Sequence, residues 1–413
     1  MSNNLKYGTI GSPEALELAD KYGDHNYLPL PVVIAKGEGV FMWDPEGNRY
    51  YDFLSAHSTL NQGHCHPKII KALCDQAQIL TLTTRAVMDN KLGEYEKFIT
   101  EYFGYEMVMP MNSGAEGMEA AMKIVRKWAY NVKGVEDDKA IIIFTENNFH
   151  GRSIALVSGS SNPHYYKGYG PLLPGIAKVP FNDSNALKDF LVENGKNVAA
   201  FFVEPIQGEA GVFVPDDGYL KSCFDLCKEH NVLFVADEIQ SGLARTGKLL
   251  GCDHDNVRPD VLVLGKSLSG GVLPVSAVLA DREIILQIEP GQHGSTFAGF
   301  PLAGVVVKAA LEVVRDENLA ENALELGEYF RKEIRSIKHP MLTLVRGRGL
   351  LNAIVVKPKD GLEAWDVCLM LKDKGLICKP THRHTIRMAP PLIITKEQMV
   401  ECVHIIKDVF NAL

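Results

Sequence analysis

The chain has 413 residues, a formal net charge of −8, and 46% hydrophobic and 23% charged residues. At about 100–200 residues per domain, this length predicts two or three domains, and the ordinary composition excludes wholesale disorder. The acidic balance argues against a nucleic acid or an anionic membrane as the main partner. No uninterrupted apolar run approaches the ~20 residues of a membrane span.

The cysteines and the amino-terminal segment indicate a reducing compartment. Of the eight cysteines, the closest pair is Cys223 and Cys227, which have the spacing of a buried helix face and not of a disulfide framework. The first eight residues contain neither an apolar signal core nor an Arg-rich presequence. We therefore expect a cytoplasmic location.

The middle of the chain alternates short apolar runs with longer helical patterns. The periodicity predicts helices over 114–130 and 219–230. Predicted strands cover residues 107–111, 140–144, 176–179, 199–203, 232–236, 261–264 and 276–279. Such alternation predicts an α/β fold with a mainly parallel sheet that helices cover on both faces.

After Pro301 the pattern changes to long amphipathic helices, predicted over 302–314 and 319–337, with a strand-rich segment around 347–356. A capping box at 395–398 predicts the start of a last helix. We interpret this region as a second, smaller α+β domain. The predicted organisation is an N-terminal segment over 1–52 that packs with the small domain, a large domain over 53–300, and the small domain over 301–413.

Two predicted strands end at residues that suggest chemistry. Asp237 directly follows the run 232–236, and Lys266 follows the run 261–264. The carboxyl ends of strands line the ligand crevice in an open α/β sheet. A lysine there can form an imine with an aldehyde, and a carboxylate can hold a pyridine nitrogen protonated. A strand-end lysine is also commonly a solvated loop residue, so the pair alone leaves both interpretations open.

A third feature is the strand-to-helix segment 111–116, which contains Ser113. Backbone N–H groups at this helix start, together with the Ser113 hydroxyl, suit a phosphate group. Taken alone, Ser113 is typical of an ordinary N-cap. Together, the acid Asp237, the lysine Lys266 and the phosphate cradle at Ser113 are the components of a site for pyridoxal phosphate.

Six motifs connect the chain to a known family. In order they are NQGHCHP at 61–67, NFHGR at 148–152, VEPIQGEAG at 203–211, ADEIQSG at 236–242, GK at 265–266 and HGSTF at 293–297. From about residue 22 to residue 413 the chain resembles the class-III pyridoxal-phosphate aminotransferases, and among them the ornithine δ-aminotransferases. The resemblance implies the fold-type I transferase fold, with a mainly parallel seven-stranded sheet in the large domain and a smaller α+β domain.

The resemblance also implies roles for individual residues. Lys266 would bond to the cofactor and carry a proton, and Asp237 would pair with the pyridine nitrogen. The other implied cofactor contacts are Phe149 stacked on the ring, Gln240 beside the ring hydroxyl, Ser113, Gly114 and Ala115 at the phosphate, and Thr296 reaching the phosphate from the partner subunit of a homodimer.

The implied reaction moves the δ-amino group of ornithine to 2-oxoglutarate by a ping-pong mechanism, giving glutamate 5-semialdehyde and glutamate. Arg152 and Arg387 are the candidates for binding the two carboxylates of the diacid, because each can bind a carboxylate with two hydrogen bonds. In the family, Glu209 pairs with the arginine numbered Arg387 here and masks it until the diacid arrives. Tyr27 would join Arg152 at the α-carboxylate of ornithine.

His57 departs from the family pattern, because related ornithine aminotransferases have a tyrosine in this segment. The donor therefore stays open between ornithine and another ω-amine, namely N-acetylornithine, 4-aminobutyrate or lysine. An aminomutase or racemase, or a non-enzymatic scaffold or regulatory protein, are further alternatives. His150 stands where some relatives carry tryptophan. We expect no metal at the His64-Cys65-His66 tract, since no further ligand spacing supports one.

Overall fold

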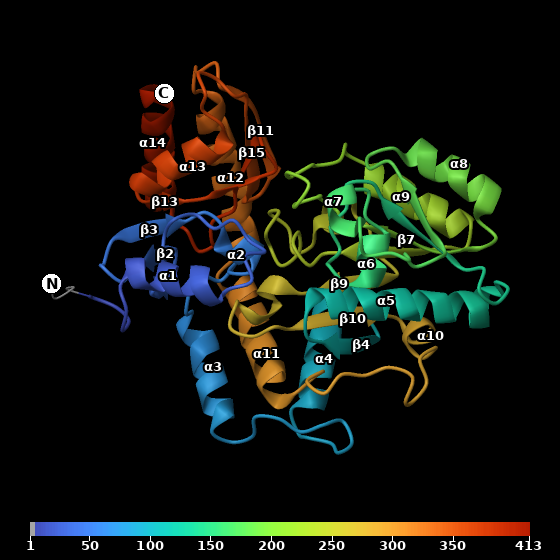
Figure 1. Ribbon diagram of the computed structural model, residues 1–413. Coiled ribbons are helices and arrows are strands. Elements are labelled where there is room, and N and C mark those ends of the chain that lie inside the picture. Colours follow the sequence, from blue (N-terminus) through green and yellow to red (C-terminus); the bar gives the residue numbers. More distant parts are fainter. Residues whose placement is uncertain (1–4) are drawn as a thin grey trace.

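The computed structural model describes residues 5–413. Residues 1–4 lie outside the described residues. They belong to the amino-terminal segment on which the expectation of a cytoplasmic location is based. Figure 1 shows the helices α1 Ser12–Tyr22, α2 Ser55–Ser58, α3 Pro67–Ala77, α4 Leu92–Phe103, α5 Gly114–Trp128, α6 Ile154–Ser158, α7 Pro163–Tyr166, α8 Ser184–Asn194, α9 Tyr219–Glu229, α10 Arg282–Ile285, α11 Pro301–Asp316, α12 Leu319–Arg335, α13 Ala364–Asp373 and α14 Lys396–Ala412. None of the helices between residues 5 and 413 has both the length and the apolar character to cross a membrane.

A seven-stranded sheet forms the centre of the larger part of the molecule. Its strands, in spatial order, are β4 Met107–Met111, β10 Ser276–Ala280, β9 Val261–Leu264, β8 Leu233–Asp237, β7 Val198–Val203, β5 Ile141–Thr145 and β6 Ile176–Val179. All neighbours are parallel except β10, which is antiparallel to both β4 and β9. The seven predicted strands are confirmed, and the mainly parallel α/β sheet with them.

Helices cover both faces of this sheet because the strands are apolar on both faces. Along β9, Val261 and Val263 pack into the cluster that includes α5, whereas Leu262 and Leu264 pack into the cluster of α4 and α11. At β5, Ile143 faces the cluster of α8 and α9. The predicted sandwich of helices around the sheet is therefore confirmed.

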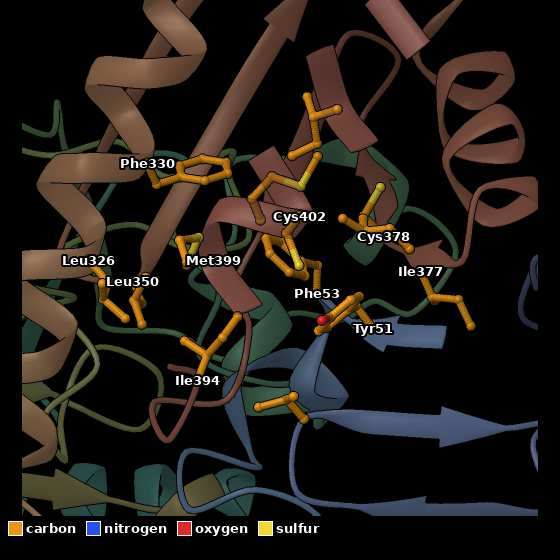
Figure 2. Close-up of a cluster of buried hydrophobic side chains, with 14 of the residues drawn as sticks. Tyr51, Phe53, Leu326, Phe330, Leu350, Ile377, Cys378, Ile394, Met399 and Cys402 are labelled. Carbon is orange, nitrogen blue, oxygen red and sulfur yellow. The ribbon is translucent and has the colours of Figure 1, made fainter. Parts of the chain in front are cut away.

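The chain's two ends form the remaining part, which contains two four-stranded sheets. One has the order β1 Lys36–Glu38, β2 Phe41–Trp43, β3 Arg49–Asp52, β13 Leu376–Ile377, and the other the order β11 Leu342–Arg348, β12 Leu351–Val356, β15 Thr385–Met388, β14 Lys379–Thr381. β3 pairs in parallel with β13, so an amino-terminal strand completes a sheet with a carboxyl-terminal one. Figure 2 shows Phe53 in one buried cluster with Phe330, Met399 and Cys402.

Helix α11 links the two parts of the fold. Val306 and Val313 contribute to the core that the chain ends share, whereas Val307 and Leu311 pack into the core beside the large sheet. The helix therefore belongs to both cores and not only to the small one. The domain boundaries at residues 52 and 300 stay predictions.

Candidate active site

The candidate site lies at the carboxyl ends of the parallel strands. Asp237 is the last residue of β8, Glu204 follows β7 directly, and Lys266 follows β9 after one glycine. These residues line a cavity of about 360 Å³. Its other lining residues are Tyr27, Ala56, His57, Gly114, Ala115, Phe149, His150, Gly151, Arg152, Ile206, Glu209, Ile239 and Gln240.

Asp237 is held in one orientation by two hydrogen bonds. Its Oδ2 lies 2.7 Å from Nδ1 of His150, and its Oδ1 accepts from the backbone N–H of Ile239 at 3.0 Å. The carboxyl side chain is buried at 4% exposure. Because an ionised carboxylate only accepts hydrogen bonds, His150 donates from Nδ1. Its Nε2 has no hydrogen-bond partner among the described residues.

Lys266 faces the same cavity from a left-handed backbone conformation with φ of 44°. Burial lowers the pKa of its amine, against the opposing effects of Asp237 and Glu209. Its amine therefore loses its proton at a lower pH than an ordinary lysine does. A deprotonated amine is the form that can act as a nucleophile or accept a proton.

Glu204 and His150 are absent from the predicted site. Glu204 accepts a hydrogen bond from the backbone N–H of Phe149 at 2.9 Å. Burial, and then the neighbouring charge of Asp237, raise the pKa of Glu204 well above its ordinary value. The signal that singles out Asp237, a position directly after an apolar strand, also applies to Glu204 and could have identified it.

The start of α5 supplies another wall of the cavity. Ser113 is the N-cap of this helix, its hydroxyl accepts from the N–H of Glu116 at 3.2 Å, and the Glu116 carboxylate accepts from the N–H of Ser113 at 3.1 Å. The N-cap interpretation is confirmed. Gly114 and Ala115 line the cavity, whereas Ser113 does not appear in its described lining. The first N–H groups of a helix lack partners within the helix, so this wall suits an anion.

Aromatic and polar side chains form the rest of the wall. The Arg152 guanidinium carbon lies 5.0 Å from the ring centroid of Phe149 and 3.8 Å from that of Tyr165. Gln240 donates from Nε2 to the backbone oxygen of His57 at 3.2 Å. Tyr27 also lines the cavity, whereas Thr296 is exposed and outside the described lining.

Arg387 lies on β15 and is buried at 2% exposure. Its Nη1 donates to Oε2 of Glu209 at 2.7 Å, and its Nη2 contacts Nδ1 of His57. Burial alone would raise the pKa of Glu209, but the charge and the hydrogen bond of Arg387, together with His57 and Lys266, lower the pKa overall. Among the described residues, His57 and Glu209 line the cavity and Arg387 does not. The arginine therefore contacts the cavity wall through these two side chains.

The histidines of the His64-Cys65-His66 tract have separate partners. Nε2 of His64 lies 2.8 Å from Oδ2 of Asp52, and Nε2 of His66 lies 2.9 Å from Oε1 of Glu317. Within residues 5–413, no group of three or more His, Cys, Asp or Glu side chains has the arrangement of a metal site.

Comparison with known proteins identifies the family. Residues 22–410 match the family model described as aminotransferase class-III. The chain is 54% identical over 405 residues to the mitochondrial ornithine aminotransferase of Rattus norvegicus, covering 98% of this chain and 92% of that protein. The solved ornithine aminotransferase of Toxoplasma gondii matches with a TM-score of 0.95 and 48% identity, covering 99% and 95% of the two chains. The solved acetylornithine aminotransferase of Elizabethkingia anophelis matches with a TM-score of 0.90 and 52% identity, covering 98% and 100%. The chain belongs to the class-III aminotransferase family.

Proposed function

We propose that this chain transfers the δ-amino group of ornithine to 2-oxoglutarate with pyridoxal phosphate as its cofactor, giving glutamate 5-semialdehyde and glutamate. The observation that carries the proposal is the ion pair of Arg387 with Glu209 beside the cavity of Lys266 and Asp237. A ping-pong enzyme of this kind must bind a donor with one carboxylate and then an acceptor with two. Arg387 meets both requirements if Glu209 neutralises it while the donor is bound and releases it when the acceptor with two carboxylates binds.

The residues around the cavity fit the cofactor. The Asp237 carboxylate is held in place by His150 and can accept a hydrogen bond from a ring nitrogen. Phe149 offers a planar face for stacking on the ring. The N–H groups of Gly114 and Ala115, at the start of α5, suit the phosphate. Gln240 would lie beside the ring hydroxyl. Gly208 allows Gln240 to approach, because a Cβ at Gly208 would lie 1.6 Å from Oε1 of Gln240.

When bound, pyridoxal phosphate supplies an electron sink for the electrons of the bond that the substrate carbon gives up. Nζ of Lys266 accepts the proton that the substrate carbon releases and later returns it to the second atom that reacts. The lowered pKa of Lys266 favours this role, because it leaves the amine free to accept a proton. Asp237 would pair with the ring nitrogen of the bound cofactor, and His150 holds the carboxylate in place.

Arginines orient the substrates. Arg152, with Tyr27, binds the α-carboxylate of ornithine, so that the δ-amine points toward Lys266. In the second half-reaction, Arg152 and Arg387 bind the two carboxylates of 2-oxoglutarate. Arg387 must exchange Glu209 for the substrate carboxylate at that point.

We further propose a homodimer with shared active sites as the working unit. The support is that Thr296 is exposed and outside the cavity of its own chain, although it belongs to the motif HGSTF. From a partner subunit, its hydroxyl would join Gly114 and Ala115 at the phosphate.

The proposal is tested by mixing the holoenzyme with ornithine alone in a stopped-flow spectrophotometer. The expected result is loss of the cofactor's visible absorption band in a single turnover, followed by its return on addition of 2-oxoglutarate. An unchanged band with ornithine contradicts the proposal.

A second candidate donor is N-acetylornithine. It is favoured by the 52% identity to a protein named acetylornithine aminotransferase and by His57 in place of the family's tyrosine. Relative kcat/KM values for ornithine, N-acetylornithine, 4-aminobutyrate and lysine decide between these donors. Turnover that continues without any oxo-acid would instead indicate an aminomutase or racemase.

A further inference from the structure

The element α2, Ser55–Ser58, is a turn with an unusual backbone and not a regular helix. Four consecutive residues, none of them glycine, have φ values of 46°, 45°, 60° and 67°. This left-handed region is sparsely populated by residues with a Cβ and persists only where surrounding contacts hold it. Oδ1 of Asp52 accepts from the N–H groups of Leu54 and Ser55, both at 2.8 Å. Gln240 holds the other end through the His57 carbonyl.

The consequence of this turn is the position of the His57 ring. Its Nδ1 contacts Nη2 of Arg387, while Nη1 of the same guanidinium donates to Glu209. A guanidinium has no acceptor, so Nδ1 of His57 accepts and the ring is neutral with its hydrogen on Nε2. Arg387 is therefore shared between two acceptors, and both line the cavity.

The charges around His57 favour this neutral form. The charges that act on the ring are those of Arg387, Glu209, Lys266 and Lys379. Desolvation lowers the pKa of His57, Arg387 and the two lysines lower it further, and Glu209 opposes them. At neutral pH the histidine is thus available as an acceptor.

We propose that His57 is a specificity-determining positioning residue that, together with Glu209, retains Arg387 and so sets the affinity of the site for the second carboxylate of a diacid. The inference rests on the proposed function, because it assigns the arginine to 2-oxoglutarate. A diacid must take the guanidinium from both acceptors, whereas a substrate with one carboxylate leaves the pair undisturbed. Loss of the His57 acceptor leaves Nη2 free for the diacid.

The test compares His57→Ala and His57→Gln, which remove the acceptor at the Nδ1 position, with His57→Asn, whose amide oxygen replaces it. His404→Ala, an exposed histidine on α14, is the matched control. The ligands are glutarate, measured by calorimetry on the holoenzyme, and the acceptors 2-oxoglutarate and 2-oxopentanoate, which differ only by the second carboxylate.

Removing one hydrogen bond to a charged group should tighten glutarate binding and lower KM for 2-oxoglutarate by roughly ten- to a hundredfold in His57→Ala and His57→Gln. KM for 2-oxopentanoate should stay constant, and His57→Asn should restore the wild-type values. Unchanged glutarate affinity in both variants overturns the inference, as does an equal shift for the two oxo-acids. Absence of turnover by the wild-type enzyme with ornithine and 2-oxoglutarate counts against the proposed function instead, because the glutarate titration does not depend on turnover.

Discussion

The Asp237 carboxylate can serve as a fixed charge because of its burial and hydrogen bonds, and not only because it is an acid. A solvated aspartate could rotate and exchange partners with water, but this one is buried and fixed at both oxygens by His150 and the N–H of Ile239. A preorganised charge of this kind stabilises a developing charge without reorganisation during the reaction.

Asp237→Asn keeps the shape of the side chain and removes its charge. We expect kcat to fall by about 10²–10³-fold, the typical loss for one preorganised electrostatic contact, because a neutral amide cannot hold the ring nitrogen protonated. Steady-state assays measure the effect, with Asp137→Asn on the exposed surface as the control. A kcat within a few-fold of wild type would contradict the role given to Asp237.

His57 predicts a pH dependence that separates diacids from monoacids. Its pKa lies below the ordinary value of 6.5, so the ring gains its proton at a lower pH than an ordinary histidine does. Protonated His57 cannot accept from Arg387 and adds a positive charge beside it. The ratio of kcat/KM for 2-oxoglutarate to that for 2-oxopentanoate should therefore rise as the pH falls, while the ionisation of Lys266 cancels in the ratio. The same rise in His57→Asn, which cannot titrate, would exclude His57 as its source.

At the scale of elements, the capping box of α14 can be tested independently of the site. The Thr395 hydroxyl accepts from the N–H of Gln398 at 3.2 Å, and the Gln398 side chain accepts from the N–H of Thr395 at 2.9 Å. Thr395→Ala should lower the free energy of unfolding by about 1 kcal/mol, the usual cost of losing an N-cap, and leave KM unchanged. Urea unfolding measures it against the control Thr9→Ala, an exposed residue outside the helices. Equal stability of both variants would show that the cap contributes nothing.

Elements with a strong local pattern were predictable and the connections were not. The strands β4, β6 and β9 have the predicted bounds, because burial on both faces requires continuous apolar runs. The turn Ser55–Ser58 has no glycine or proline to indicate its left-handed backbone, and contacts with Asp52 and Gln240 from other elements hold it. Sequence periodicity likewise could not show that α11 contributes to two cores.

On the scale of the whole molecule, the site joins residues that are far apart in the chain. Arg387 contacts Glu209 across 178 positions and His57 across 330. Strand-end position made Asp237 and Lys266 candidates, whereas Arg387 and Glu209 came only from the family resemblance. The contact between His57 and Arg387 was not predictable, because it depends on how the amino-terminal turn packs against β15.

The proposed homodimer leads to the last prediction, which concerns the connection between α3 and α4. This segment exposes four large apolar side chains, with Met88 81% and Val87 61% exposed, together with Ile79 and Leu80. Several exposed large apolar side chains in one segment are typical of a protein interface. Val87→Glu should shift the protein toward monomer in sedimentation velocity and weaken cofactor retention during dialysis, because Thr296 would no longer reach the partner's phosphate site. Val192→Glu, at a residue of α8 that is 68% exposed, is the matched control and should leave assembly unchanged. A Val87→Glu protein that sediments like wild type would place the subunit contact elsewhere.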